Sequence, residues 1–410
     1  MRISSLLSVF TALTAIATAT PFQFQHQDNS RSPDVLEQHY ADEHFHLSGD
    51  FITSKKATLQ EKWGEEWPFT GIPTFAHLNT SKCLLHPDLE YDIGIIGVPF
   101  DTTTSYRAGA RFGPKAIRDA SQRQHSLRGF NTRAGINPYQ NWATFLDCGD
   151  IPVSPMDNAI AFDQMTQAFE ELLLRRSSSD DPTHPPRYIA LGGDHSILLP
   201  HLRALHKVYG KIAVIHFDAH LDTWSPESYP SYWSSEQSKL THGSMLWIAR
   251  EEKILSDDNN VHIGLRTRLS GDDWGDYNSD TSQGWKRYSA DDVWTDGVEG
   301  LNRMVREIHE RIPQDMPVYI SVDVDCMDPG NTPGTGTIEA GGMLPREVIY
   351  LLRKIDLNLV GADVVEVSPQ FDHAEITATN AAQVAYELIT SMVKKGKPLS
   401  SNIEVERIEE

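Results

Sequence analysis

Residues 212–222 read Ile-Ala-Val-Ile-His-Phe-Asp-Ala-His-Leu-Asp, an apolar run that ends in two histidines and two aspartates. Continuous rather than alternating apolarity predicts a strand buried on both faces, as in a parallel sheet. From residue 92 onward the chain contains further runs of this form, each of which leads into Gly, Asp, His or Pro. They are residues 92–98, 144–147, 188–191, 261–265, 318–322 and 360–367.

Helical patterns separate these predicted strands. Apolar residues fall on one stripe in residues 159–175, 298–312 and 346–355. Strands that alternate with helices predict an α/β fold of three layers, with helices on both faces of a mostly parallel sheet. Neither an internal repeat nor a second domain is apparent, so we assign residues 61–400 to one catalytic domain.

Three of the predicted strands end in an unusual concentration of acidic and imidazole side chains. In a parallel sheet the ligand site lies outside the carboxyl ends of the strands, so these residues are expected to converge. They are His195 after the third strand, Asp218, His220 and Asp222 after the fourth, and Asp323 and Asp325 after the strand at 318–322.

Carboxylates gathered in one pocket repel each other, and divalent cations remove that repulsion. In Asp218-x-His220-x-Asp222 alternate residues of an extended segment point to one side, and the same spacing pairs Asp323 with Asp325. An oxygen-rich set with two imidazoles favours Mn²⁺, with Fe²⁺, Co²⁺, Ni²⁺ or Zn²⁺ as alternatives. Two such ions could hold a hydroxide between them, a strong nucleophile near neutral pH.

The three motifs at Gly192–Ser196, His216–Asp222 and Ser321–Pro329 resemble the signatures of the arginase/agmatinase ureohydrolases. The resemblance extends over most of the chain, from about Tyr91 to Met392, and its form is closest to a fungal-type, secreted agmatinase. It implies an arginase/deacetylase-like fold with an eight-stranded central sheet. It also implies a binuclear manganese hydrolase that cleaves a guanidino compound to urea, with a metal-bridging hydroxide as nucleophile.

The resemblance assigns a role to each of these residues. Asp218 and Asp323 would bridge two Mn²⁺ ions; Asp222 would also orient the hydroxide. The remaining ligands divide between the ions as His195 with Asp222, and His220 with Asp325. His242, in Thr241–Ser244, would shuttle a proton to the leaving amine, and Glu366 would bind the substrate guanidinium.

Physical chemistry supports the last two assignments. A carboxylate pairs well with the forked donors of a planar guanidinium, and a histidine can protonate a nitrogen that would otherwise leave as an amide anion. Without the resemblance, an ordinary surface histidine is the preferred interpretation of His242. Glu366 is then equally well interpreted as a carboxylate paired with a neighbouring base.

Agmatine, cleaved to putrescine and urea, is the predicted substrate. Arginases hold the α-groups of arginine with an Asn- and Thr/Ser-rich stretch after the Asp-x-His-x-Asp motif, and here that stretch begins Thr223-Trp224-Ser225 and differs. A guanidinobutyrase-like activity or an arginase remains the alternative. Aromatic residues in the long segment 223–241 could line a pocket or only pack the loop: Trp224, Tyr229, Tyr232 and Trp233.

Two alternative functions belong to other classes of enzyme. A deacetylase-like enzyme would share the fold but resembles a single-zinc site, whereas His195 and Asp325 favour two metals. A phosphoesterase would bind an anion, which Glu366 and the acidic composition disfavour. A formal net charge of -21 likewise argues against a nucleic-acid partner and favours a cationic small molecule. The resemblance suggests a homo-oligomer, a trimer or hexamer.

The first residues predict a secretory route. Arg2, an apolar run over residues 6–17 and the small residues at 17–19 form a signal-peptide pattern. Asn79-Thr80-Ser81 is a candidate glycosylation sequon. We therefore expect a secreted or vacuolar protein without a membrane span. The remaining segments are a signal peptide at 1–19, a flexible arm at 20–60 and a C-terminal tail at 401–410.

Only three cysteines occur, too few for a disulfide framework. We interpret Cys148 and Cys326 as small buried packing residues. One disulfide among the three remains possible.

Overall fold

The computed structural model describes residues 63–64, 67–178, 184–228 and 233–397. The predicted signal peptide at 1–19, arm at 20–60 and tail at 401–410 lie outside the described residues. The chain divides into two units, Met1–Glu65 and Glu66–Glu410. The fold below is that of the second unit.

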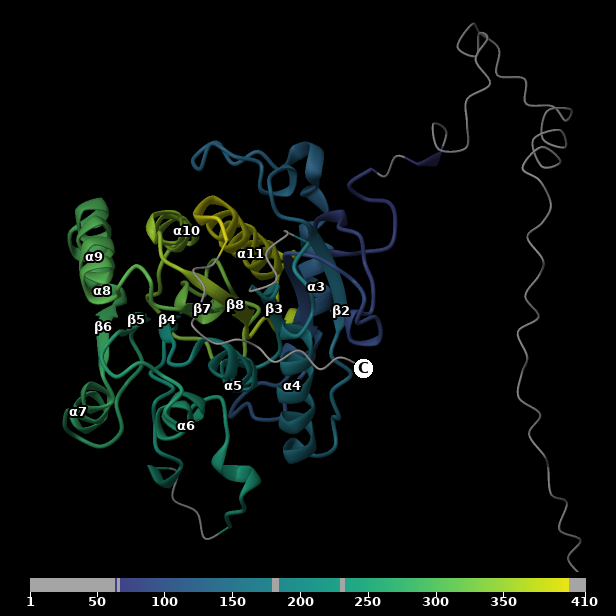
Figure 1. Ribbon diagram of the computed structural model, residues 1–410. Coiled ribbons are helices and arrows are strands. Elements are labelled where there is room, and N and C mark those ends of the chain that lie inside the picture. Colours follow the sequence, from purple (N-terminus) through teal and green to yellow (C-terminus); the bar gives the residue numbers. More distant parts are fainter. Residues whose placement is uncertain (1–62, 65–66, 179–183, 229–232, 398–410) are drawn as a thin grey trace, which may run out of the picture. The chain divides into compact units, whose positions relative to one another are not determined.

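A single sheet of eight strands forms the centre of this unit (Figure 1). All neighbouring strands are parallel, and their spatial order is β2-β1-β3-β8-β7-β4-β5-β6. The strands are β1 (Ile93–Val98), β2 (Phe145–Asp150), β3 (Arg187–Gly192), β4 (Ala213–Phe217), β5 (Asn260–Leu265), β6 (Trp285–Ser289), β7 (Val318–Asp323) and β8 (Leu359–Val365). The α/β prediction is confirmed.

Strand β6 is the one strand that the search for apolar runs missed. Its sequence is Trp-Lys-Arg-Tyr-Ser, in which polar residues separate the buried Trp285 and Tyr288 and Lys286 is exposed. It forms an edge of the sheet, where one side of the strand has no partner strand and polar residues are tolerated. A search for continuous apolarity finds the central strands and passes over such an edge.

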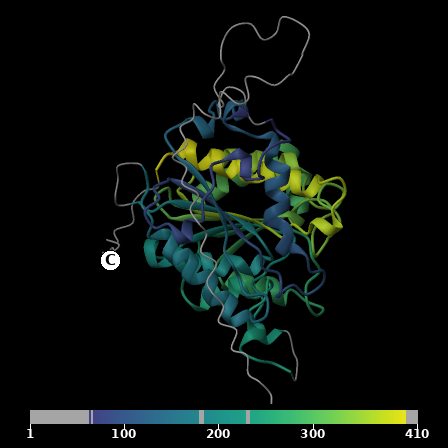
Figure 2. The ribbon, with the colours of Figure 1, turned by 90° about the vertical axis from the view of Figure 1, so that its right-hand side faces the viewer.

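Helices cover both faces of the sheet (Figures 1 and 2). Helices α3, α9, α10 and α11 pack on one face, and α4, α5 and α6 pack on the other, each through its own cluster of buried apolar side chains. Their bounds are α3 (Gly113–Ala120), α4 (Asn158–Leu173), α5 (Leu198–Tyr209), α6 (Met245–Glu251), α7 (Gly275–Ser282), α8 (Ala290–Thr295), α9 (Gly297–Arg311), α10 (Pro345–Lys354) and α11 (Ile376–Lys395).

The three predicted helices correspond to α4, α9 and α10, with ends displaced by one or two residues. The shift at α4 has a local cause, because the Asp157 side chain accepts a hydrogen bond from Ile160 N and caps the helix one residue early. Among the described residues, no helix combines the length and the apolarity that crossing a membrane would need.

Cys83 and Cys148 form a disulfide that ties the segment before β1 to strand β2. The interpretation of Cys148 as a packing residue is therefore wrong in part, since it is buried but covalently paired. Cys326 is a free, buried thiol, as expected. Sequence alone could not select the pair because the two cysteines are 65 positions apart and meet where the segment around Thr80 pairs with Asp147 of β2.

We expect the double variant Cys83→Ser/Cys148→Ser to be less stable than the wild type by roughly 2–4 kcal/mol, because the disulfide restricts the unfolded chain. Denaturant unfolding measures the difference. A reducing agent should destabilise the wild type by a similar amount and leave the double variant unchanged. Equal unfolding midpoints for the wild type and the variant would contradict this prediction.

Candidate metal centre and substrate carboxylate

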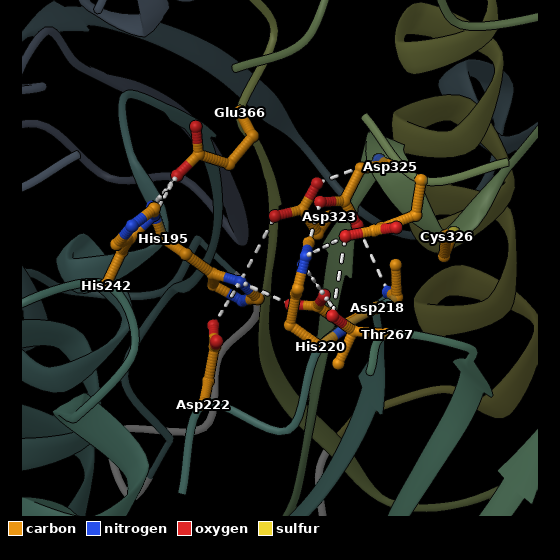
Figure 3. A network of polar contacts seen from close by, with 12 residues as sticks. His195, Asp218, His220, Asp222, His242, Thr267, Asp323, Asp325, Cys326 and Glu366 are labelled. Carbon is orange, nitrogen blue, oxygen red and sulfur yellow. Dashed lines mark hydrogen bonds and ion pairs between the residues drawn. The ribbon is translucent and has the colours of Figure 1, made fainter. Parts of the chain in front are cut away.

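Four adjacent strands of the sheet end at the candidate site. In spatial order they are β3, β8, β7 and β4, and they lie in the middle of the sheet. Their carboxyl ends carry the predicted residues: His195 follows β3, Glu366 follows β8, Asp323 ends β7, and Asp218 follows β4. The structure thus brings together all the predicted ligands in one cluster, in which His220 is partly exposed and the others are buried (Figure 3).

The loop after β3 carries His195 and passes close to the backbone at Phe100. An added Cβ at Gly193 would lie 2.2 Å from the Phe100 carbonyl oxygen, so only glycine fits there. The Asp194 side chain caps the short helix that contains His195 by accepting from Ser196 N, and it also accepts from Thr103 N at 3.0 Å. The imidazole of His195 is thereby fixed on a rigid turn.

His195 forms the centre of a first group of ligands. Its Nδ1 lies 2.9 Å from Asp218 Oδ2, 3.3 Å from Asp222 Oδ2 and 3.4 Å from Asp323 Oδ2. On the other side of the ring, Nε2 lies 2.7 Å from Ser321 Oγ, whose hydroxyl donates to Asp363. Because that hydroxyl donates to a carboxylate, it accepts from Nε2, and the Nδ1 lone pair faces the three aspartates.

His220 forms a second group. Its Nδ1 lies 3.2 Å from Asp218 Oδ1 and 3.1 Å from Asp325 Oδ2. Asp218 therefore turns one carboxylate oxygen to each histidine and belongs to both groups. Asp323 joins the groups differently, because its Oδ1 accepts a hydrogen bond from Asp325 N while its Oδ2 faces His195.

The clustered carboxylates disturb each other's ionisation. Burial and the charges of Asp325 and Asp218 raise the pKa of Asp323 well above its usual value. Burial and the charge of Asp218 likewise raise the pKa of Asp325 to about 6. The same two causes raise the pKa of Asp222. For Asp218 burial acts in the same direction, but His216, His195 and His220 outweigh it and hold the pKa well below the usual range. The cluster is thus deficient in positive charge.

The donor set fits divalent cations. Three buried polar atoms in the cluster have no hydrogen-bond partner among the described residues: His195 Nδ1, His216 Nε2 and Asp218 Oδ2. Unpaired buried polar atoms are costly, and a cation among them would satisfy a lone pair and a carboxylate together. The buried His/Asp cluster is therefore able to bind metal through oxygen and imidazole ligands.

Asp222 and Glu366 share an uncommon backbone conformation. Their φ angles are 54° and 62°, in the left-handed region that non-glycine residues rarely occupy. Such conformations cost about 1–3 kcal/mol and are concentrated at functional sites. Each residue is followed directly by a buried neighbour that anchors it, Thr223 and Val367 respectively.

Glu366 and His242 meet beside the cluster (Figure 3). Glu366 Oε1 accepts from His195 N at 2.9 Å and lies 3.2 Å from His242 Nδ1. The other oxygen, Oε2, is buried without a hydrogen-bond partner among the described residues. Burial lowers the pKa of His242, but the hydrogen bond and charge of Glu366 outweigh it and raise the pKa to about 9.

Ser105 offers His242 a partner in either protonation state. Ser105 N donates to His242 Nε2 at 3.1 Å, which suits the neutral ring. The Ser105 hydroxyl lies 3.0 Å from the same nitrogen and can accept from it when the ring is charged. A histidine with both kinds of partner can take up and release a proton without losing its position.

His216 is a site residue that sequence reasoning missed. It is fully buried, and its Nε2 lies 3.2 Å from Asp218 Oδ2, while its ring stacks on His195. The signal was available, because the alternation that places Asp218 and His220 on one side of the chain also includes His216. Ser321 and Asp363, which support His195, gave no sequence signal because both lie inside strands.

Other predicted features are placed less centrally. Trp224 is half-buried, Trp233 is exposed, and Tyr229 and Tyr232 lie outside the described residues. The exposed side chain of Trp233 gives no support to a pocket lined by this loop. In the candidate sequon, Asn79 is exposed, as glycosylation requires.

The arginase family model matches residues 91–390, which include every residue of the site described above. The chain belongs to the arginase family. This arginase-family chain is 42% identical to "Putative agmatinase 1" of Schizosaccharomyces pombe over 335 residues, covering 80% of this chain and 83% of the relative. The predicted family and the predicted ureohydrolase-type hydrolase are confirmed.

Solved structures extend the comparison to the fold. Proclavaminate amidinohydrolase from Streptomyces clavuligerus superimposes with a TM-score of 0.69 at 35% identity, covering 80% of this chain and 100% of that chain. An arginase from Medicago truncatula superimposes with a TM-score of 0.57 at 25% identity, covering 73% of this chain and 87% of that chain. The arginase-like sheet predicted for this chain is confirmed.

Proposed function

We propose that this protein hydrolyses the guanidinium group of agmatine, giving putrescine and urea, with two Mn²⁺ ions bound in the His/Asp cluster. One observation supports this most directly: Glu366 keeps a buried, unpaired carboxylate oxygen beside a cluster that divides into two ligand groups. A planar guanidinium is the cation that such an oxygen pairs with best.

Asp218, with one oxygen toward each histidine, would hold both ions together with Asp323. His195 and Asp222 would complete one ligand set, and His220 and Asp325 the other. Ions bound there would supply a water whose pKa is lowered to about 7, and thus a nucleophile at neutral pH.

Other residues of the chain would bind the substrate, orient the water and transfer a proton. Glu366 Oε2 binds the guanidinium, which fixes its carbon beside the cluster. Asp222 accepts a hydrogen bond from the attacking water and orients it. His242 delivers a proton to the departing nitrogen, and Ser105 holds the imidazole before and after that transfer.

The choice of agmatine follows from the segment after Asp222. In this chain the hydroxyl of Thr223 is buried and donates to Asp280 at 2.8 Å, so it cannot hold a substrate α-carboxylate. The chain is also 37% identical, over 317 residues, to a protein named agmatinase in Enterobacter. Agmatine has no carboxylate and needs no such contact.

Urea release with Mn²⁺ tests this proposal on agmatine, arginine, 4-guanidinobutyrate and 3-guanidinopropionate. We expect kcat/KM to be at least about tenfold higher for agmatine than for the others, since one unmet polar contact is worth over 1 kcal/mol. A preference for a guanidino acid would overturn the substrate assignment. Absence of urea from all four compounds would overturn the function.

We also propose that the protein enters the secretory pathway and is secreted or vacuolar. The disulfide between Cys83 and Cys148 supports this, because such bonds persist mainly in oxidising compartments. Exposure of Asn79 gives independent support. A trimer or hexamer remains a prediction from the family and is tested by light scattering.

A further inference from the structure

A chain of buried polar side chains leads away from Asp218, behind the ligands. It begins at His216, whose Nε2 lies 3.2 Å from Asp218 Oδ2. On its other side, His216 Nδ1 lies 2.9 Å from Nδ1 of His262. The pairing of β4 with β5 sets these two histidines directly opposite each other, so the contact is fixed by the sheet.

The next contact in this series joins His262 to a carboxylate, that of Asp280. His262 Nε2 lies 3.1 Å from Asp280 Oδ1, and its ring stacks on Trp285 with 3.9 Å between ring centroids. Asp280 lies on α7 and is fully buried, as are both histidines. A buried carboxylate facing an imidazole accepts from the ring, which fixes the orientation of His262 and, through it, that of His216.

Asp280 also reaches the metal ligands by a second path. The hydroxyl of Thr223 donates to Asp280 Oδ1 at 2.8 Å, and Thr223 directly follows Asp222. Asp222 has the left-handed backbone described above, so its neighbour must be held firmly. Gln283 adds to this anchor by donating to the carbonyl oxygen of Thr223 at 3.0 Å.

The charge on Asp280 is maintained locally. Arg287 Nη1 donates to Asp280 Oδ2 at 2.6 Å. Burial raises the pKa of Asp280, but His262, Arg287 and Thr223 outweigh it and leave the pKa below its usual value. Asp280 Oδ2 thus accepts from Arg287, while Asp280 Oδ1 contacts His262 and Thr223.

We propose that Asp280 is a positioning residue of the metal centre, which fixes His216 beside Asp218 through His262 and holds Asp222 through Thr223. Both ligands belong to the group around His195, so one buried carboxylate aligns two ligands of the same ion. This inference rests on the proposed metal binding and concerns residues of α7, β5 and β6 that lie outside the ligand set.

The test measures affinity for Mn²⁺ itself. Metal-free protein is titrated with Mn²⁺, and the free ion is followed by its electron paramagnetic resonance signal. For Asp280→Asn we expect the dissociation constant of one of the two ions to rise about 10- to 100-fold, the usual cost of losing an outer partner of a metal site.

Glu387→Gln is the matched control. Glu387 is also fully buried and paired with an arginine, Arg353 Nη2 lying 2.6 Å from its Oε1, but its partners do not include a metal ligand. Both variants should lose thermal stability through a broken buried ion pair. Only Asp280→Asn should lose Mn²⁺ affinity, which separates positioning from general weakening of the fold.

Two further variants cover the case in which Asp280→Asn does not fold. His262→Phe keeps the stack on Trp285 but removes both hydrogen bonds, and Thr223→Val removes only the hydroxyl. Each is expected to weaken Mn²⁺ binding. If the folded variants bind Mn²⁺ as the wild type does, the positioning role is refuted. If the wild type binds no Mn²⁺, the proposed function fails instead.

Discussion

Asp323→Asn is expected to abolish urea release and to leave the protein with less bound metal. The amide keeps the shape of the side chain and can still accept from Asp325 N, but it offers no negative charge to a cation. Loss of an outer partner of a metal site already lowers metal affinity about 10- to 100-fold, so loss of a ligand should lower it at least about 100-fold. Metal content after dialysis and urea release with agmatine measure the two effects.

Thermal melting of the metal-free proteins separates this result from misfolding. The substitution removes one of four crowded carboxylates, so the metal-free variant should melt no lower than the metal-free wild type. Asp147→Asn is the matched control, since Asp147 is equally buried and paired with Arg118 at 2.9 Å but lies on β2, away from the cluster. Full metal content and activity in Asp323→Asn would refute the assignment of Asp323.

Glu366→Gln is expected to lower kcat/KM for agmatine roughly 10²–10³-fold, because truncating one partner of a buried charged pair costs about 2–5 kcal/mol. The glutamine carbonyl can still accept from His195 N, so the ligand loop should keep its position. What changes is the second oxygen, the one left free in the structure, which becomes an amide that cannot pair with a guanidinium. Steady-state kinetics and metal content measure the effect.

His242→Asn provides the contrasting case. It should lower kcat about 10²-fold or more, the usual contribution of a positioned proton donor, with a smaller change in KM. Both variants should keep their metal, since neither Glu366 nor His242 belongs to the two ligand groups. If Glu366→Gln lost metal, or if its activity equalled that of the wild type, the role of Glu366 in binding substrate would be wrong.

Much of the fold could be predicted because the central strands are buried on both faces. Such strands require continuous apolar sequence, which β3, β4 and β7 display without ambiguity. Strand β6 lies at an edge, is only partly buried and was missed for that reason. The disulfide was undecidable because pairing depends on where Cys83 lies in space relative to β2.

The sequence by itself determined most of the side chains that meet in the His/Asp cluster, because metal chemistry needs particular residue types at strand ends; only His216 was missed. His195, Asp218, His220 and Asp325 come together in two ligand groups, and Asp323 lies against the first of them.

Only the tertiary structure decided how these segments are ordered. The order β3-β8-β7-β4 places Glu366 between the ligand loops, although it lies over 140 positions after Asp222 in the sequence. The pairing of β4 with β5 sets His216 opposite His262, and His262 in turn contacts Asp280. Lateral strand order depends on how helices pack across the sheet, and no local pattern of residues encodes it.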